Sequence, residues 1–136
     1  MKILFVDDEP WLSIPLRAVL EAKGFECISK SDMTAAWEYL EENQVEVLVT
    51  DIMMPGGKRF PEIDSQETGF HLVSKARVKW PKLSIICLSV INNINKIDSL
   101  KRKSVYYLHK GETTLETAAM LIESKATGVF KYKGKK

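Results

Sequence analysis

The chain has 136 residues, of which 45% are hydrophobic and 28% are charged, and its formal net charge is +2. This length favours one domain, and the composition supports a packed core and argues against disorder. No apolar run approaches the roughly 20 residues of a membrane-spanning helix, and the short run at residues 3–6 is not a signal peptide, so we expect a cytoplasmic protein with no membrane contact.

Short apolar runs predict five strands. The first run is uninterrupted, a pattern typical of strands in a parallel sheet whose two faces are both covered. Three of the others have the same character, and one, which follows the turn signal at Gly24, is weaker. The five runs are Ile3–Val6, Phe25–Ser29, Val45–Thr50, Leu83–Leu88 and Val105–Leu108.

Apolar residues at helical spacing occupy the stretches after these runs. Pro15 lies inside the first expected helix, where it removes a backbone donor, so we expect a bend or a late start there. Thr113 and Glu116 fit a capping box at the start of the last helix. The five helical stretches are residues 10–23, 33–40, 72–80, 92–103 and 115–122.

The alternation of strands and helices predicts an α/β fold, a doubly wound parallel sheet with helices on both faces. Right-handed crossovers leave few topologies for such a chain. In open sheets of this kind, ligands bind beyond the carboxyl ends of the strands. Residues directly after the strands are therefore the first candidates for chemistry.

Polar side chains follow four of the expected strands, namely Asp7-Asp8-Glu9, Asp51, Ser89 and Lys110. Clustered carboxylates repel one another unless a cation or a proton neutralises them, and Mg²⁺ suits a phosphate-handling site with oxygen ligands. A carboxylate can attack phosphorus and form an acyl phosphate. The lysine and the metal would then stabilise charge on the transferring group.

The segments Val6-Asp7-Asp8-Glu9-Pro10 and Thr50-Asp51-Ile52-Met53-Met54-Pro55, together with Ser89 and Lys110, resemble the signature of response-regulator receiver domains. The resemblance covers the whole chain. It implies the flavodoxin-like, CheY-like receiver fold, with five parallel strands in the order 2-1-3-4-5. We expect the receiver domain at residues 1–125.

The same resemblance implies that Asp51 accepts a phosphoryl group from a sensor histidine kinase or a phosphotransfer protein. Asp7, Asp8 and Asp51 would hold Mg²⁺ together with the backbone carbonyl of Met53. A capping role for Asp8 remains open, because an acid after a strand can also begin a helix. Such a domain is not an enzyme in the ordinary sense, since it catalyses only its own phosphorylation and dephosphorylation.

Three further residues receive roles from the resemblance. Lys110 would bind the phosphoryl group, Ser89 would follow it, and Tyr107 matches the aromatic residue that turns inward on activation. The signal would reach a downstream protein, or a second copy of the chain, through the face made by the fourth helix, fifth strand and fifth helix. The chain would act through its own surface or as one part of a larger protein.

The chain departs from the family pattern in three places. Gly111 stands where the family usually has a proline after its lysine. Residues 55–68 indicate an insertion beside the site, a lid or a partner contact. Residues 101–104 are basic where small residues are usual. Neither His71 nor His109 has the partner spacing of a metal site or a catalytic dyad, so no role is assigned to them.

Two residues bear on the lifetime of the phosphorylated state. Met53 and Ile91 lie two positions after Asp51 and Ser89, and neither apolar side chain can orient an attacking water. We therefore expect slow self-dephosphorylation. Two other functions stay open: a Mg²⁺-dependent phosphatase with an aspartate nucleophile, and a receiver-like module that binds partners without phosphotransfer.

The charge of the chain is uneven. Five lysines and no acid lie from Lys125 onward, while the preceding part holds more acids than bases. We expect residues 126–136 to form a solvated basic tail. The rest of the chain does not have the charge of a nucleic-acid-binding protein, so we expect no direct nucleic-acid contact.

Overall fold

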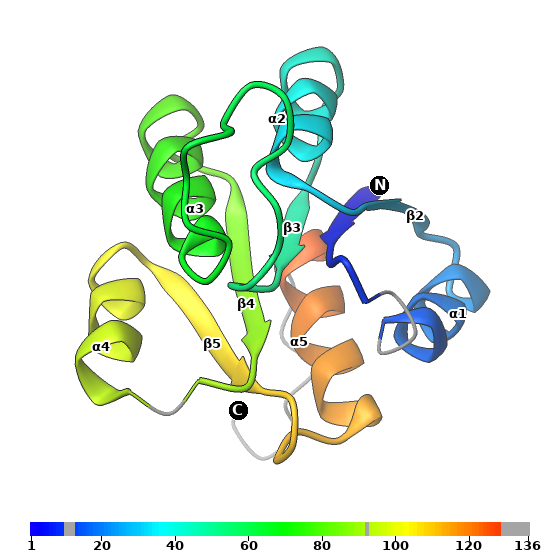
Figure 1. Cartoon of the computed structure of the whole chain (residues 1–136). Coiled ribbons are helices and arrows are strands. Elements are labelled where there is room, and N and C mark those ends of the chain that lie inside the picture. Colours follow the sequence, from blue (N-terminus) through cyan, green and yellow to red (C-terminus); the bar gives the residue numbers. More distant parts are fainter. Residues whose placement is uncertain (10–12, 92, 129–136) are drawn as a thin grey trace.

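The computed structural model describes residues 1–9, 13–91 and 93–128. In this part of the chain five strands alternate with five helices (Figure 1). In chain order they are β1 (Lys2–Val6), α1 (Ile14–Ala22), β2 (Glu26–Lys30), α2 (Met33–Glu42), β3 (Val47–Thr50), α3 (Thr68–Lys79), β4 (Ser84–Ser89), α4 (Ile94–Arg102), β5 (Val105–His109) and α5 (Leu115–Thr127).

The five strands form one parallel sheet in the order β2-β1-β3-β4-β5, which confirms the predicted fold class. The register aligns the carboxyl ends of the strands. Val6 of β1 pairs with Thr50 of β3, and Ser89 of β4 pairs with His109 of β5. The residues that follow these strands are therefore brought to one edge of the sheet.

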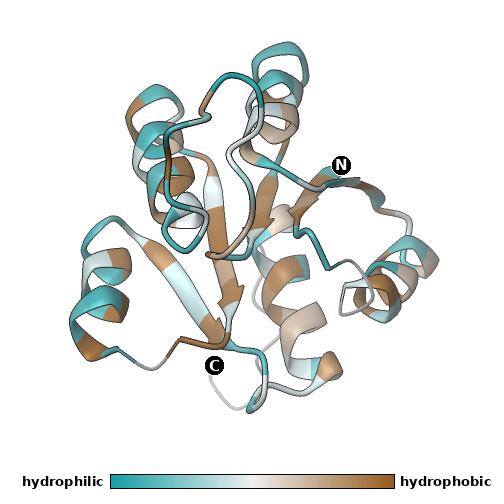
Figure 2. Cartoon of the chain, in the orientation of Figure 1, coloured by the Kyte–Doolittle hydropathy of each residue, from teal (hydrophilic) through white to brown (hydrophobic). Residues whose placement is uncertain are grey.

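Helices cover both faces of the sheet. One face carries α1 and α5, and the other carries α2, α3 and α4 (Figure 1). The central strands β1, β3 and β4 are mostly hydrophobic (Figure 2), and β3 is buried along its whole length. Two apolar cores, one on each face, thus hold the sheet in place, and the apolar runs of the central strands have their cause in this double burial.

The sequence made specific predictions for the first residues of two helices, α1 and α5. Helix α1 begins at Ile14, with Pro15 in its first turn, where a missing N–H breaks no helical bond; the expected late start is confirmed. The capping residue expected for α5 was wrong. Thr114 rather than Thr113 caps this helix, because its Oγ1 accepts the N–H of Thr117 at 3.1 Å.

The long connection between β3 and α3 packs against α2. Thr34 donates from its Oγ1 to the Gly56 carbonyl at 2.7 Å and accepts the N–H of Arg59 at 2.9 Å. Gly57 has a positive φ of 85°, and a Cβ there would lie 2.6 Å from Thr34 Oγ1, so only glycine fits. The contacts of this loop are thus made with α2, while Phe60 packs on the apolar core beside it.

The predicted basic tail, residues 126–136, begins inside the last helix, since α5 runs to Thr127 and ends at Gly128 with a φ of 73°. The remaining eight residues of that prediction lie outside the described residues. None of the described helices is both long enough and apolar enough to span a membrane.

Candidate functional site

Three predicted site residues meet at the carboxyl edge of the sheet. Asp7 follows β1, Asp51 follows β3 and Lys110 follows β5. Backbone hydrogen bonds continue past the strands and fix all three: Asp51 N–H donates to Val6 at 3.0 Å, Asp7 N–H to Lys30 at 3.0 Å, and Lys110 N–H to Ser89 at 2.7 Å. Parallel neighbours therefore place side chains from distant parts of the sequence within contact distance.

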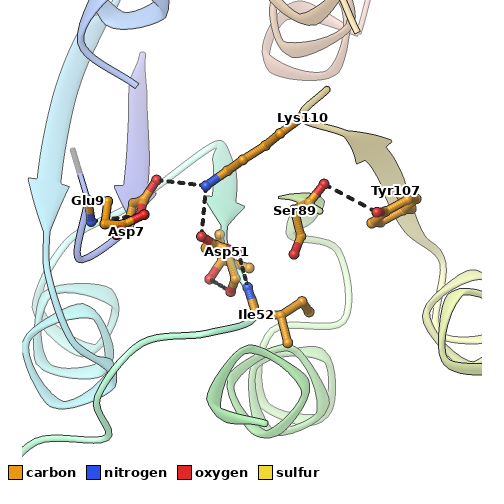
Figure 3. Close-up of polar contacts among 8 residues, drawn as sticks. Asp7, Glu9, Asp51, Ile52, Ser89, Tyr107 and Lys110 are labelled. Atoms are coloured by element: carbon orange, nitrogen blue, oxygen red, sulfur yellow. Dashed lines mark hydrogen bonds and ion pairs between the residues drawn. The ribbon is translucent and has the colours of Figure 1, made fainter. Parts of the chain in front are cut away.

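The ammonium of Lys110 lies between two carboxylates. Its Nζ is 2.8 Å from Asp51 Oδ2 and 3.3 Å from Asp7 Oδ2 (Figure 3). The three side chains are 9–10% exposed. Because one positive charge faces two negative ones in a nearly dry setting, the cluster carries an uncompensated negative charge and attracts a further cation.

The remaining carboxylate oxygens are held by the backbone. Asp51 Oδ1 accepts the N–H of Ile52 at 2.6 Å, and Asp7 Oδ1 accepts the N–H of Glu9 at 2.9 Å. Both oxygens of each carboxylate therefore accept a hydrogen bond. Such fixed geometry is what a reaction at one carboxylate oxygen requires.

Burial and charge shift the protonation of this cluster. Burial raises the pKa of the Asp7 carboxyl and the charge of Asp51 adds to the effect, although the Glu9 N–H and Lys110 oppose it. Burial works to lower the pKa of Lys110, but the hydrogen bond and the charge of Asp51 outweigh it, and the pKa of Lys110 is raised. Lys110 is therefore charged at neutral pH and can pair with anionic groups.

Ser89 ends β4 next to this cluster, and its side chain is fully buried. Its Oγ has no hydrogen-bond partner among the described residues. A buried hydroxyl without a partner costs about 1–3 kcal/mol. A hydrogen-bond acceptor within reach of this hydroxyl would remove the cost.

Tyr107 lies on the other side of Ser89 (Figure 3). Its hydroxyl contacts the carbonyl of Ser89 at 3.2 Å and that of Ile91. Burial raises the pKa of Tyr107 to about 12, so the phenol keeps its proton and acts as a donor. In this structure the ring is half-buried and its hydroxyl is tied to the segment that leads from β4 to α4.

Two other predicted metal ligands, Asp8 and the Met53 carbonyl, take no part in the contacts described above. Asp8 is exposed, and the Met53 side chain is 42% exposed. In the described ranges no three acidic, histidine or cysteine side chains form a group that could hold a metal. Asp7 and Asp51 still present the oxygen donors that Mg²⁺ prefers, with excess negative charge beside them. The donors fit this ion chemically, while Asp8 and the Met53 carbonyl stay predictions as ligands.

Two features of the site were not predicted from the sequence. Gly69 lies where a Cβ would come within 2.2 Å of the Asp51 carbonyl oxygen, so the start of α3 approaches the backbone of Asp51 too closely for any side chain. His109, given no role above, accepts the N–H of Gly111 at its Nδ1 at 3.1 Å. The sequence does contain a signal for this second contact, because His109 and Gly111 are two positions apart with Lys110 between them.

The comparisons with known proteins agree with this geometry. Residues 3–121 match the family model of the response regulator receiver domain. Response regulator GtcR of Aneurinibacillus migulanus is 31% identical over 120 residues, which cover 88% of this chain and 45% of the relative. The chain spans at most about half the length of each curated relative that it matches.

Solved structures share the fold. A CheY-like receiver domain protein from Methanospirillum hungatei JF-1 has a TM-score of 0.78 and 18% identity, with 93% of this chain and 94% of that one covered. Response regulator TrrA from Thermotoga maritima, solved with Mg²⁺ and BeF, has a TM-score of 0.72 and 20% identity, with 91% and 97% covered. Similarity at this level of identity concerns the fold.

Proposed function

The chain belongs to the response regulator receiver family, and on that premise we propose that it accepts a phosphoryl group on Asp51 in a Mg²⁺-dependent reaction. Members of this family serve phosphorylation-controlled signalling and are regulatory domains rather than ordinary enzymes. In the proposal the chain, a cytoplasmic receiver domain at residues 1–125, catalyses only its own phosphorylation and dephosphorylation. The donor is a sensor histidine kinase or a phosphotransfer protein.

The observation that carries this proposal is the pairing of Asp51 with Lys110 at 2.8 Å in a nearly buried site. An oxygen of Asp51 attacks the phosphorus of the donor, a P–O bond forms, and the bond from phosphorus to the donor atom breaks with its electron pair leaving on the donor. Lys110 then moves from the carboxylate to an oxygen of the phosphoryl group, which keeps its charge paired throughout.

Asp7, Asp8, Asp51 and the Met53 carbonyl would hold Mg²⁺ in this scheme. The ion would neutralise negative charge on the transferring oxygens. Asp7 supports this reading because its nearly buried carboxylate shares one counter-charge, Lys110, with the carboxylate of Asp51. The Ile52 N–H keeps Asp51 oriented through one carboxylate oxygen.

Ser89 and Tyr107 would pass the change to the surface. A phosphoryl oxygen on Asp51 supplies an acceptor for the buried Ser89 Oγ, which has none among the described residues. Movement of Ser89 alters the carbonyl to which Tyr107 donates, and Tyr107 lies on β5. We place the partner surface, for a downstream protein or a second copy, on α4, β5 and α5, where Ile94, Tyr106 and Met120 are exposed.

A labelling experiment tests the proposal. Wild type and the Asp51→Asn variant are treated with Mg²⁺ and acetyl phosphate, and the phosphorylated fraction is measured by intact mass. Only the wild type should gain the mass of a phosphoryl group. Asp98→Asn, at an exposed site on α4, should be labelled like the wild type. Equal labelling of the Asp51→Asn variant would show that another residue is the acceptor.

A further inference from the structure

The turn that follows β5 is closed by one residue. His109 accepts the N–H of Gly111 at its side-chain Nδ1, at 3.1 Å. Its backbone carbonyl accepts the N–H of Glu112 at 3.1 Å and that of Thr113 at 3.0 Å. Three hydrogen bonds to one residue thus enclose residues 110–112, and Lys110 is the first residue inside the turn.

The residue at position 111 makes the side-chain bond possible. Glycine adds backbone freedom where a proline would restrict φ, and it keeps an N–H that proline lacks. No cis peptide bond occurs among the described residues, and Gly111 does not have a positive φ. A bond from the side chain of one residue to the N–H two positions later is a known way to fix such a turn, and here it replaces the restraint that the ring of proline would supply.

The imidazole fits closely in this place. A Cβ on Gly111 would lie 3.3 Å from His109 Cε1 and 3.5 Å from Nδ1. The imidazole also lies edge-to-face with the ring of Tyr107, at a centroid distance of 6.4 Å and an interplanar angle of 80°. The imidazole therefore contacts both the turn that carries Lys110 and the aromatic ring beside Ser89.

We propose that His109 is a positioning residue for Lys110: its Nδ1 bond to Gly111 holds the turn in the shape that places Nζ between Asp51 and Asp7. The proposal rests on the proposed function, because the effect on phosphorylation presupposes that Asp51 is the acceptor. His109 itself does not contact the reacting atoms. Its effect passes through the backbone of Lys110, whose N–H is fixed on Ser89 at 2.7 Å.

Substitutions at residue 109 separate this bond from other effects of the ring. His109→Ala removes the acceptor, and we expect the rate of phosphorylation by acetyl phosphate to fall about fivefold, the factor typical of one lost hydrogen bond. His109→Asn keeps an acceptor that reaches the N–H two residues later, so its rate should stay within about twofold of wild type. His71→Ala, at the exposed histidine of α3, is the matched control and should change nothing.

Gly111→Pro supplies a stringent second test. With proline at residue 111 there is no N–H for residue 109 to accept. His109→Ala and His109→Asn should therefore have equal rates in the Gly111→Pro background, although they differ in the glycine background. A difference of the same size in both backgrounds would overturn the proposal, since the side chain would then act through something other than this bond.

A measurement without any phosphodonor keeps this inference separate from the proposed function. In the metal-free protein, the ¹³C shift of the Asp51 carboxyl and the ¹⁵N shift of Lys110 Nζ report their pairing. Both should move in His109→Ala and stay near wild type in His109→Asn. If neither moves in His109→Ala, the inference is wrong, even where Asp51 is phosphorylated normally. If both move but the wild type cannot be phosphorylated, the positioning stands and the proposed function fails.

Discussion

Lys110 Nζ lies 2.8 Å from Asp51 Oδ2, while the N–H of Ile52 holds Oδ1 of the same carboxylate at 2.6 Å. Both oxygens of the proposed acceptor are therefore occupied before any phosphoryl group arrives. The bond from Ile52 can persist through the reaction, because it comes from the adjoining backbone. The bond from Lys110 has to change partner, so this ion pair is the part of the site that phosphorylation rearranges.

The first prediction concerns the strength of this ion pair. Lys110→Met should lower the free energy of unfolding by about 3 kcal/mol, since it leaves two nearly buried carboxylates without their counter-charge. In the double variant with Asp51→Asn, the cost should be smaller than the sum of the two single costs. Urea unfolding in EDTA measures all four proteins of this cycle.

A surface ion pair provides the control for that cycle. Lys96 pairs with Glu67 at 2.7 Å, but both side chains are more than a third exposed. Lys96→Met should therefore cost no more than about 1 kcal/mol. Equal costs for Lys96→Met and Lys110→Met would mean that the pair at Asp51 has no special stability.

The second prediction concerns Asp7 and pH. Because burial raises the pKa of Asp7, the folded state favours its protonated form. The associated stability is present at low pH and is lost as the pH rises through the raised pKa. Asp7→Asn should thus be more stable than the wild type at neutral pH without metal, by about 1 kcal/mol.

The advantage of Asp7→Asn should shrink as the pH falls through the raised pKa of Asp7, where the wild-type carboxyl also becomes neutral. Thermal unfolding across the acid range in EDTA measures this difference. Asp98→Asn, at an exposed site on α4, should show no such pattern. A variant at Asp7 that is less stable than the wild type at neutral pH would contradict the account that burial disfavours the charged Asp7 carboxyl.

The third prediction concerns the buried hydroxyl of Ser89. Since its Oγ has no partner among the described residues, Ser89→Ala should leave the stability of the unphosphorylated protein unchanged or raise it by up to about 1 kcal/mol. With Mg²⁺ and beryllofluoride, a mimic of the phosphoryl group, the variant should gain less stability than the wild type. Thermal unfolding with and without the mimic measures both effects.

Ser124 is the control for Ser89, because its buried Oγ does donate a hydrogen bond, to the Leu121 carbonyl at 2.9 Å. Ser124→Ala should cost about 1 kcal/mol and should leave the gain from beryllofluoride at the wild-type value. The prediction for Ser89 is wrong if Ser89→Ala destabilises the unphosphorylated protein as much as Ser124→Ala does.

The fourth prediction concerns the loss of the phosphoryl group. Met53 is 42% exposed and cannot orient an attacking water, so hydrolysis of the phosphorylated wild type should be slow. Met53→Asn introduces a polar group there and should speed hydrolysis several-fold. The decay of the phosphorylated mass after removal of the donor is the measurement, and Val78→Asn, at a residue of α3 that is 84% exposed, should decay like the wild type. Equal decay of both variants would contradict this role of residue 53.

Much of the fold could be predicted because its signals are local. The apolar runs located all five strands. The ends of some strands differ from the ends of the runs, because pairing with the neighbouring strand determines where a strand begins and ends. The run at Val45–Thr50 begins two residues before β3, and the run at Phe25–Ser29 lies one residue early, because β2 takes its register from β1, Lys2 to Glu26. Such limits depend on neighbours that a single run does not contain.

The candidate site could be predicted as far as strand ends determine it. The structure brings Asp7, Asp51 and Lys110 together because their strands are parallel neighbours that end at one edge. Hydrogen bonds of individual side chains could not be predicted, because they depend on distances set by the assembled sheet and turns. Examples are the bond at His109 and the Ser89 hydroxyl, which finds no partner in the described part of the chain.

The central claim, that Asp51 is the acceptor, can be tested at the level of the single residue. The wild-type protein is phosphorylated with acetyl phosphate and Mg²⁺, and borohydride then reduces the acyl phosphate to an alcohol, which converts the modified aspartate to homoserine. Peptide mass spectrometry locates the change. We expect homoserine at residue 51 and at no other acid; homoserine at Asp7 or Asp8, or a phosphorylated protein with Asp51 intact, would contradict the account.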